Sequence, residues 1–320
     1  MQGARDSCAD ISVEWDNPGN SSIPFSIRAR YNGGSMEDDG MKTAIIDVGG
    51  GMRGIYAAGV FDRCMDEKRT FDLCIGVSAG AANVVAFLAN QRGRNYRFYA
   101  KYPSRKEYMS LGNFLISKSY LDLNYVYGTL SNSDGEDPVD FETFEKNPSE
   151  LMVVACNAIT GEAKYFGKQD FHKDDYSVLK ASSAIPVVCH PYGVDGTLYY
   201  DGALADPVPV DKALECGCDR VILILTKPRE VRRTDTKDRF LAGLMDKHYA
   251  KAAERLRERA KLYNDSVDMA LEYEKQGKLL IIAPESTEGA DTLTKDKEIL
   301  HRLYLRGYAD GEKIDAFLKA

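Results

Sequence analysis

Phe71-Asp-Leu-Cys-Ile-Gly-Val-Ser-Ala-Gly-Ala-Ala-Asn83 joins an apolar run of strand type to small and apolar residues suited to a helix. The junction, Gly76-Val-Ser-Ala-Gly80, has the layout of a nucleophile elbow, in which a serine hydroxyl stands at a sharp turn between strand and helix. Gly76 and Gly80 lack Cβ atoms, so the turn can tighten and the helix can sit against the strand. Because many such strings are ordinary turns, the interpretation of Ser78 as a nucleophile needs support elsewhere in the chain.

The segments around this junction alternate between strand and helix patterns. Thr43–Val48 predicts a buried strand, Gly49-Gly-Gly-Met-Arg-Gly54 a loop, and the apolar spacing that follows a helix. Later patterns predict strands at 150–156, 163–166 and 220–226, and helices at 79–92, 176–184 and 210–217. Such alternation predicts an α/β fold with a mostly parallel sheet and helices on its faces.

The last third of the chain is predicted to be mainly helical. A long helix at about 249–275 has an apolar seam that we expect to pack on the body of the protein rather than on a partner helix, formed by Ala253, Leu256, Ala260, Tyr263, Val267 and Ala270. Leu279–Ala283 predicts a last strand in the same sheet, and two short helices follow Thr294. We therefore expect an N-terminal extension at 1–42, a catalytic domain at 43–226 and a C-terminal helical region at 227–320.

The extension at 1–42 is rich in Gly, Ser, Asn, Asp and Pro, which predicts partial disorder, although 23–31 has the pattern of an edge strand. The net charge of −7 argues against general nucleic-acid binding. No apolar run approaches the roughly 20 residues that a membrane span needs. The start of the chain has no apolar signal region, and the seven cysteines show no disulfide or zinc spacing, so we expect a cytoplasmic protein without a metal site.

The glycine loop admits two nucleotide-binding interpretations, and neither fits well. Gly49-x-Gly51-x-x-Gly54 follows a strand and opens a helix, as a dinucleotide-binding turn does. That site needs an acidic residue at the end of the next strand, where this chain has Gly76-Val-Ser-Ala-Gly80. A phosphate-binding P-loop needs Gly-Lys-Ser/Thr, whereas Ile55 and Tyr56 follow Gly54.

An acyl-transfer interpretation gives a role to both glycine motifs. Ser78 would attack an ester carbonyl, and the backbone N–H groups of the 49–54 loop would face the charge that develops on its oxygen. We assign Gly49, Gly50, Gly51 and Arg53 to this oxyanion site. Arg53 would hold the loop in shape or bind an anionic headgroup, and a structural salt bridge is an equal alternative.

A serine nucleophile also needs a base. Of the four histidines, His190 is the least implausible, because the others lie in polar or charged contexts (His172, His248 and His301). Asp201 in Tyr199-Tyr-Asp-Gly-Ala203 is the better candidate, since a carboxylate at a strand end can approach the serine hydroxyl directly and partial burial would raise its basicity. An Asp-Gly turn without chemistry is the alternative for this residue.

Two basic segments, 92–106 and 227–261, allow contact with a membrane surface. The first carries six Lys/Arg and no acid, and seven tyrosines lie between Tyr96 and Tyr127. This region would form a lid or an acyl-binding wall, or a helical insertion that packs its aromatic side chains into the core. We favour the helical insertion.

Taken together, these motifs resemble the patatin-like phospholipase family. The resemblance spans about 43–226 and rests on Asp47-Val-Gly-Gly-Gly-Met-Arg-Gly54, Gly76-Val-Ser-Ala-Gly80 and Asp201-Gly-Ala203, with Ala181-Ser-Ser-Ala-Ile-Pro186 before the aspartate. It implies a three-layer α/β/α sandwich, a phospholipid or other lipid ester as substrate, and neither metal nor cofactor. It also implies Ser78 as nucleophile and Asp201 as general base, supported by the motif glycines Gly54, Gly76, Gly80 and Gly202.

Lipid acyl-ester hydrolysis through an acyl-enzyme is therefore our first hypothesis. A histidine-dependent serine esterase and a non-catalytic lipid-binding or regulatory protein remain alternatives.

Overall fold

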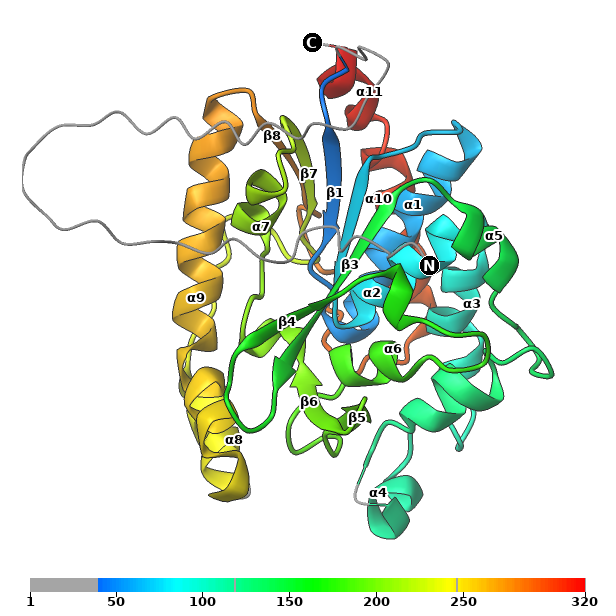
Figure 1. Ribbon diagram of the computed structural model, residues 1–320, viewed down its shortest axis with the longest axis vertical. Coiled ribbons are helices and arrows are strands. Elements are labelled where there is room, and N and C mark those ends of the chain that lie inside the picture. The colour runs from blue at the N-terminus through cyan, green and yellow to red at the C-terminus, as the bar shows by residue number, and fades with distance from the viewer. Residues whose placement is uncertain (1–39, 118, 246, 320) are drawn as a thin grey trace, which may run out of the picture. The chain divides into compact units, whose positions relative to one another are not determined.

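The computed structural model, which describes residues 40–117, 119–245 and 247–319, contains one eight-stranded sheet (Figure 1). The strand order is β5-β6-β3-β2-β1-β7-β8, and β4 pairs with β3. The strands are β1 (Thr43–Asp47), β2 (Leu73–Val77), β3 (Glu150–Asn157), β4 (Ala163–Phe166), β5 (Tyr192–Val194), β6 (Thr197–Asp201), β7 (Arg220–Ile224) and β8 (Leu279–Ile282).

The sheet is mostly parallel, as predicted. Strands β3, β2, β1, β7 and β8 run parallel to their neighbours, whereas β4 and β6 pair antiparallel with β3, and β5 antiparallel with β6. The late strand β8 joins the edge beside β7. The expected α/β fold with a late strand in the same sheet is therefore confirmed.

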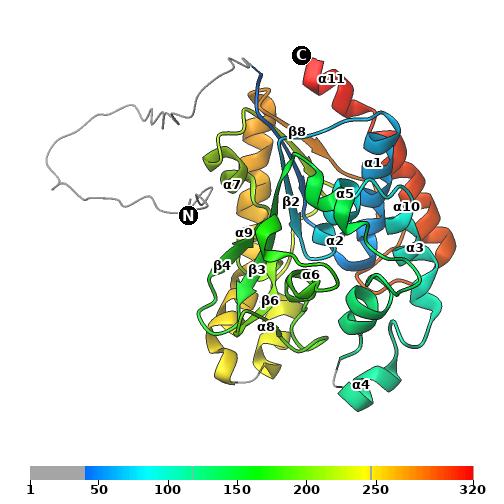
Figure 2. The same ribbon diagram turned by 45° about the vertical axis from the view of Figure 1, so that its right-hand side comes forward.

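Helices cover both faces of the sheet. In β1 the side chain of Ile45 enters one core, while Ala44 and Ile46 enter the core on the opposite face, because successive strand residues point to opposite sides. Helices α7 (Val210–Glu215) and α9 (Ala250–Lys275) cover the second face. Helices α1 (Ile55–Asp66), α2 (Ala79–Leu88), α3 (Arg94–Ala100) and α10 (Lys297–Asp310) cover the first, and both ribbon views show these groups on opposite sides (Figures 1 and 2). The predicted three-layer arrangement is confirmed.

The remaining helices are α4 (Leu111–Ser117), α5 (Phe141–Lys146), α6 (Ser177–Ser182), α8 (Thr236–Leu244) and α11 (Lys313–Lys319). Among them, α4 and α8 lie at the lower end of the views and α11 at the upper end (Figures 1 and 2).

The C-terminal helical region is packed on the rest of the fold. The α9 seam is buried along its whole length, and Tyr263, Val267 and Ala270 join the core under the sheet. Residues 42–320 form one compact unit. Nearly all of the expected extension at 1–42, with the edge strand at 23–31, lies outside the described residues.

The basic and aromatic region is a helical insertion whose charges are largely neutralised. Asp66, Glu136 and Asp137 form ion pairs with its cations, which are Arg92, Arg94, Arg97, Lys101 and Arg105. The aromatic side chains Phe98, Tyr99, Tyr102 and Tyr108 are buried in the core. This arrangement agrees with an insertion that packs its aromatics inward.

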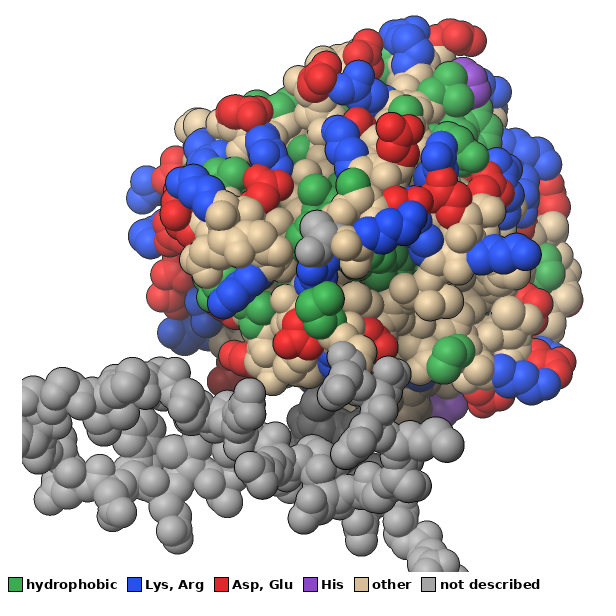
Figure 3. All heavy atoms as spheres, turned by 90° about the horizontal axis from the view of Figure 1, so that it is seen from above, with side chains coloured by type: hydrophobic (Ala, Val, Ile, Leu, Met, Phe, Trp, Pro, Cys, Tyr) green, Lys and Arg blue, Asp and Glu red, His purple; other side chains and the backbone are tan. Residues whose placement is uncertain are grey.

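The face at the amino ends of the parallel strands carries acidic and basic side chains side by side (Figure 3). Within the described residues, no helix has the length and apolar character to cross a membrane.

Candidate active site

Ser78 stands at the predicted turn, between the end of β2 and the start of α2. Its backbone has φ 57° and ψ −130°, a conformation that L-residues rarely adopt. A Cβ on Gly76 would lie 2.4 Å from the Cα of Ala81, so only glycine allows α2 to pack this closely on β2. The N–H of Ser78 donates to the hydroxyl of Ser182 at 2.9 Å, so a side chain at the end of α6 fixes the backbone of the turn.

The hydroxyl of Ser78 donates a hydrogen bond of 2.6 Å to Oδ2 of Asp201. Asp201 ends β6, and its Oδ1 accepts the N–H of Ala203 at 2.9 Å. The exposed fractions of Ser78 and Asp201 are 6% and 3%. Burial raises the pKa of Asp201, against the opposing effects of these two hydrogen bonds and of the charges on Arg259 and Arg233. A buried carboxylate of raised basicity therefore contacts the candidate nucleophile.

The histidines lie elsewhere. All four, His172, His190, His248 and His301, are exposed, and no hydrogen bond joins any of them to Ser78. The backbone N–H of His190 donates to the hydroxyl of Ser119 at 3.4 Å. The described contacts thus give Ser78 a carboxylate partner and no imidazole.

The glycine loop lies directly against the elbow. Gly49, Gly50 and Gly51 have positive φ angles of 65°, 128° and 60°. A Cβ on Gly49 would lie 2.2 Å from the carbonyl oxygen of Val77, the residue before Ser78. The backbone of Gly49 is held at both ends, because its N–H donates to Oδ1 of Asp47 at 2.9 Å and its carbonyl accepts from the hydroxyl of Thr226.

Two loop N–H groups have no recorded partner in the described part of the chain: those of Gly50 and Gly51. The next N–H, that of Met52, donates to the carbonyl of Thr292 at 3.0 Å. Gly51 begins a short 3-10 helix, η1 (Gly51–Gly54), whose first N–H groups have no intrahelical acceptor. These two groups are therefore free donors in the loop that lies against the elbow. The supporting glycines Gly54, Gly80 and Gly202 are packed against Tyr99, Asp47 and Val154.

A buried network that sequence reasoning missed supports the loop. Asp47 accepts from Gly49 and, at 2.8 Å, from the side-chain amide of Asn83 on α2. The hydroxyl of Tyr99 donates to the carbonyl oxygen of that same amide at 3.1 Å. Burial raises the pKa of Asp47 to about 7. Asp47 precedes the glycine loop in the sequence motif, but nothing local in the pattern shows which groups its carboxylate would bind.

Arg53 is buried, with an exposed fraction of 6%, and is not part of a salt bridge among the described residues. Its Nη1 donates to the hydroxyl of Thr292 at 3.3 Å, and its Nε is buried without a hydrogen-bond partner. The structural salt bridge considered for Arg53 is therefore not formed with the described residues.

A mostly apolar cavity opens beside Ser78 on the face of the sheet covered by α2 and α3. Its empty volume, open mouth included, is about 690 Å³. Its walls include Phe98, Tyr99, Tyr108, Leu123, Val126 and Tyr127. The aromatic insertion thus packs into the core and also forms the cavity wall. Among the described residues, no group of three or more His, Cys, Asp or Glu side chains is arranged to hold a metal ion.

Comparisons with known proteins agree with these motifs. The model of the patatin-like phospholipase family matches residues 48–214, and that of a domain of unknown function (DUF6363) matches 249–318. The uncharacterized protein YjjU of Escherichia coli K12 is 32% identical over 198 residues, which cover 60% of this chain and 54% of that protein. A probable lipid hydrolase of Invertebrate iridescent virus 6 is 24% identical over 207 residues, covering 60% of this chain and 66% of that protein.

An uncharacterized NTE family protein of Mycobacterium tuberculosis H37Rv is 24% identical over 205 residues, covering 63% of this chain and 52% of that protein. The match thus spans little more than half the length of the first of these relatives. Among solved structures, VipD from Legionella pneumophila aligns with a TM-score of 0.49 at 13% identity, over 87% of this chain and 67% of VipD. Since the first family model covers more than half of the 320 residues, the chain belongs to the patatin-like phospholipase family.

Proposed function

We propose that this protein hydrolyses carboxylic esters of lipids through an acyl-enzyme, with Ser78 as nucleophile and Asp201 as general base. The observation that carries the proposal is the 2.6 Å hydrogen bond from the Ser78 hydroxyl to the buried Asp201 carboxylate. That distance lies within the reach that proton transfer to a general base needs. Family membership and a relative named as a probable lipid hydrolase support the same reaction class.

In the first half of the proposed reaction, Oγ of Ser78 attacks the ester carbonyl carbon while its proton passes to Asp201. The carbonyl oxygen becomes an oxyanion, which the free N–H groups of Gly50 and Gly51 stabilise. The intermediate collapses to the acyl-enzyme, and the leaving alcohol takes the proton from Asp201. Water then attacks the acyl group with Asp201 again as base, which releases the fatty acid and restores Ser78.

Gly49 and Arg53 have supporting roles in this proposal. The N–H of Gly49 is donated to Asp47, so Gly49 shapes the loop rather than contacting the oxyanion. The guanidinium of Arg53 donates to the hydroxyl of Thr292, which lines the cavity together with Ser78.

The cavity favours an acyl chain as the part of the substrate that is held. Its lining is dominated by aliphatic and aromatic side chains, and Ser78 and Gly51 are among the lining residues. An ester whose chain occupies the cavity would present its carbonyl to both groups.

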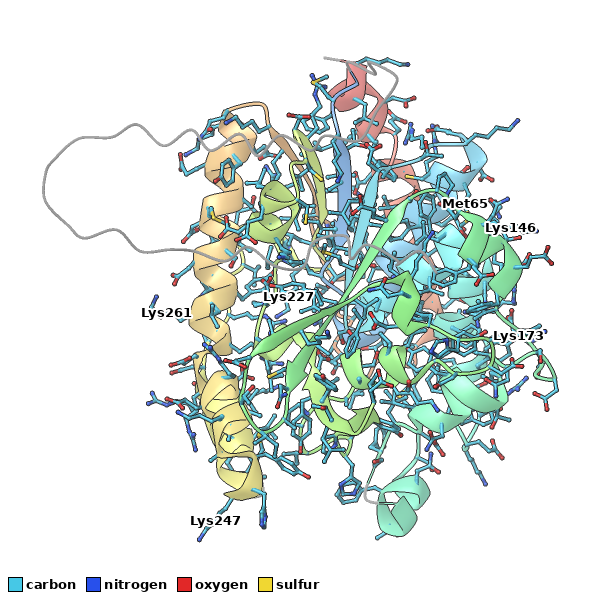
Figure 4. All side chains as sticks on the ribbon, in the orientation of Figure 1. Met65, Lys146, Lys173, Lys227, Lys247 and Lys261 are labelled. Atoms are coloured by element: carbon cyan, nitrogen blue, oxygen red, sulfur yellow. The ribbon has the colours of Figure 1, made fainter. Side chains whose placement is uncertain are left out.

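We further propose that the enzyme works on a membrane surface that its lower end contacts. Helices α4 and α8 extend there in both ribbon views (Figures 1 and 2). Each exposes large apolar side chains: Leu115 on α4 is 81% exposed, and Phe240 on α8 is 68% exposed. Lys247 extends from the same end, where it would meet anionic lipid (Figure 4).

The test is hydrolysis of para-nitrophenyl butyrate by wild-type protein and by the Ser78→Ala and Asp201→Asn variants. We expect no turnover above background for Ser78→Ala, and a loss of about 10²- to 10⁴-fold for Asp201→Asn, the usual contribution of a general base. His190→Ala is the matched control and should retain wild-type turnover. A fluorophosphonate probe should label wild-type protein and leave Ser78→Ala unlabelled.

Each alternative function makes a different prediction. Loss of turnover in His190→Ala with retention in Asp201→Asn would favour the histidine-dependent esterase. Absence of both turnover and labelling in wild-type protein, with salt-sensitive binding to anionic vesicles, would favour the non-catalytic lipid-binding protein.

A further inference from the structure

The loop that joins β8 to α10 contacts the glycine loop through one short turn. This turn, residues 290–295, is here called the C-terminal turn. Its residues Thr292 and Leu293 line the apolar cavity together with Ser78. The turn lies within the stretch 249–318, which matches the domain of unknown function. The C-terminal region therefore supplies part of the wall of the candidate active site.

Thr292 makes hydrogen bonds to two consecutive residues of the η1 helix. Its carbonyl accepts the N–H of Met52 at 3.0 Å, and its hydroxyl accepts from Nη1 of Arg53 at 3.3 Å. Met52 directly follows Gly50 and Gly51, here called the donor segment, whose N–H groups are free. Thr292 therefore holds the chain where the donor segment ends, through both its backbone and its side chain.

A second threonine holds the other end of the donor segment. The hydroxyl of Thr226 donates to the carbonyl of Gly49, the residue before the donor segment. The two free N–H groups thus lie between a fixed carbonyl at Gly49 and a fixed N–H at Met52. Because only two residues separate these points, the directions of both free N–H groups depend on the contacts at either end.

Gly51 lies against Thr292 with no space for a side chain between them. A Cβ on Gly51 would lie 2.4 Å from the carbonyl oxygen of Thr292 and 2.6 Å from its Cγ2. Groups packed this closely transmit displacements to one another. A movement of Thr292 would therefore change the position of the donor segment.

Arg53 connects the hydroxyl of Thr292 to the donor segment. The Arg53 guanidinium is buried, and the Thr292 hydroxyl is its recorded side-chain acceptor among the described residues. Its Nη2 lies 3.3 Å from the position that a Cβ on Gly50 would take. Loss of the hydroxyl would leave a buried charged donor without its acceptor, which is unfavourable, so the guanidinium would move. Since it lies against Gly50, that movement would disturb the donor segment.

The C-terminal turn is itself held in shape by hydrogen bonds. Oδ1 of Asp291 accepts the N–H of Leu293 at 2.8 Å and the hydroxyl of Thr294 at 3.1 Å. The N–H of Asp291 donates to that hydroxyl at 2.7 Å. Nζ of Lys295 donates at 2.7 Å to the carbonyl of Met109, which lines the cavity. The turn is therefore fixed relative to the cavity wall as well as to the glycine loop.

We propose that Thr292 is a positioning residue for ester hydrolysis, which keeps the N–H groups of Gly50 and Gly51 directed at the oxyanion. This proposal rests on the proposed function and gives the C-terminal turn a part in the same reaction. Donors that are already oriented stabilise the transition state without reorganisation. A loosened donor segment therefore lowers the rate of the chemical step more than it weakens binding of the ester.

The kinetic test compares Thr292→Val, which removes the hydroxyl and preserves the branched shape, with Thr292→Ser, which retains the hydroxyl. With para-nitrophenyl butyrate, Thr292→Val should lower kcat about tenfold or more and leave KM near the wild-type value, since complete loss of one oxyanion donor lowers kcat about 10²- to 10³-fold. Thr292→Ser should keep most of the wild-type kcat. A wild-type kcat in Thr292→Val would overturn the proposal.

Thr287→Val is the matched control in the same loop. Thr287 precedes the C-terminal turn and is partly exposed. Its carbonyl, which the substitution keeps, accepts the N–H of Ala290 at 2.7 Å. Thr287→Val should retain the wild-type kcat. Equal losses of kcat in Thr287→Val and Thr292→Val would overturn a specific role for Thr292.

A trifluoromethyl ketone separates stabilisation of the oxyanion from the other steps. Oγ of Ser78 adds to the ketone carbon, its proton passes to Asp201, and the carbonyl oxygen becomes an oxyanion with no leaving group to expel. The inhibition constant of butyl trifluoromethyl ketone should rise in Thr292→Val by the factor by which kcat/KM falls. A lowered kcat with an unchanged inhibition constant would place the effect outside the oxyanion site and overturn the proposal.

Amide hydrogen exchange tests the contact without relying on catalysis. The peptide that spans the glycine loop should exchange about tenfold faster in Thr292→Val than in wild-type or Thr287→Val protein, because the N–H of Met52 donates to Thr292. If wild-type protein hydrolyses no ester while this exchange depends on Thr292, the esterase function fails and the positioning of the loop stands. If wild-type protein is active and Thr292→Val alters neither kcat nor exchange, the positioning role fails and the esterase function stands.

Discussion

The hydroxyl of Ser78 and the carboxylate of Asp201 lie 2.6 Å apart, although the two residues are 123 positions apart in the chain. Strand β3 brings them together. Val77, the residue before Ser78, pairs with Val154 on one side of β3, while Asp201 itself pairs with Ala155 on the other. Adjacent residues of one buried strand thus set the spacing of the two groups, which makes the spacing insensitive to movement of surface loops.

The first prediction concerns the pH dependence of activity. Asp201 must be ionised to accept the Ser78 proton, and burial raises its pKa. Hydrolysis of para-nitrophenyl butyrate should therefore fall as the pH decreases, at a higher pH than an ordinary aspartate would give. Since the charge on Arg233 holds the pKa of Asp201 down, Arg233→Gln should move this acidic limb to higher pH.

The pH–rate profiles of wild-type, Arg233→Gln and Lys237→Gln proteins check this prediction. Lys237→Gln removes an exposed charge from α8 and should leave the limb in place. A limb that moves to lower pH in Arg233→Gln would contradict the assignment of Asp201 as the base.

The second prediction separates backbone strain from steric overlap in the glycine loop. Gly49 and Gly196 have similar positive φ angles of 65° and 77°. A Cβ on Gly196 would meet nothing within 4 Å, whereas a Cβ on Gly49 would lie 2.2 Å from the Val77 carbonyl oxygen. Gly196→Ala should lower the free energy of unfolding by about 1–3 kcal/mol, the usual penalty for this conformation.

Gly49→Ala should lower the free energy of unfolding by more than Gly196→Ala does, and it should also abolish ester hydrolysis because the loop must move away from Ser78. Urea denaturation of both variants and of wild-type protein measures the difference. Equal unfolding midpoints for the two variants would show that the loop moves to accommodate the added Cβ at Gly49 without any loss of packing.

Local patterns were sufficient to predict the fold because each of its main elements has its own periodicity. The strands around Ile45 and Ile75 are unbroken apolar runs, and the seam of α9 repeats apolar residues every three or four positions. The motif residues Ser78 and Asp201 could be chosen because each ends a strand in a sharp turn.

The supporting contacts could not be predicted in this way. The hydroxyl of Ser182 reaches the N–H of Ser78 across 104 positions, and Thr292 reaches Arg53 across 239. Arg233 is oriented by Tyr263 only because α9 lies against the sheet. Such contacts depend on tertiary packing, which periodicity does not report.

The third prediction concerns Asp47 and the pH dependence of stability. Its pKa is about 7 in the folded protein against an ordinary value of 3.8, so between these values the folded state binds more protons than the unfolded state. The contribution of Asp47 to stability is thus complete at low pH and is lost as the pH rises towards 7. Asp47→Asn should reduce the pH-dependent fall in the free energy of unfolding by about 1 kcal/mol per pH unit between pH 3.8 and about 7.

Unfolding free energies of wild-type and Asp47→Asn proteins across this range give the two slopes. Asp66→Asn is the contrasting control, because Arg92 holds the pKa of Asp66 below its usual value and its stability contribution appears at lower pH. Parallel curves for wild-type and Asp47→Asn proteins would contradict a raised pKa for Asp47.

The last prediction concerns the exposed apolar side chains of α4 and α8. If the lower end of the molecule enters a lipid surface, Leu115 and Phe240 move from water into an apolar region, which stabilises binding by up to about 1.5–3 kcal/mol for each side chain. Leu115→Ser and Phe240→Ser should each weaken binding to anionic phospholipid vesicles about tenfold, and should leave turnover of the water-soluble para-nitrophenyl butyrate near the wild-type value.

Leu305→Ser is the matched control, because Leu305 is 50% exposed but lies on α10, so its loss should not alter vesicle binding. Sedimentation with vesicles in the Ser78→Ala background measures binding without hydrolysis of the lipid. If Leu305→Ser weakens binding as much as Leu115→Ser does, the contact is not confined to the end of the molecule where α4 and α8 lie.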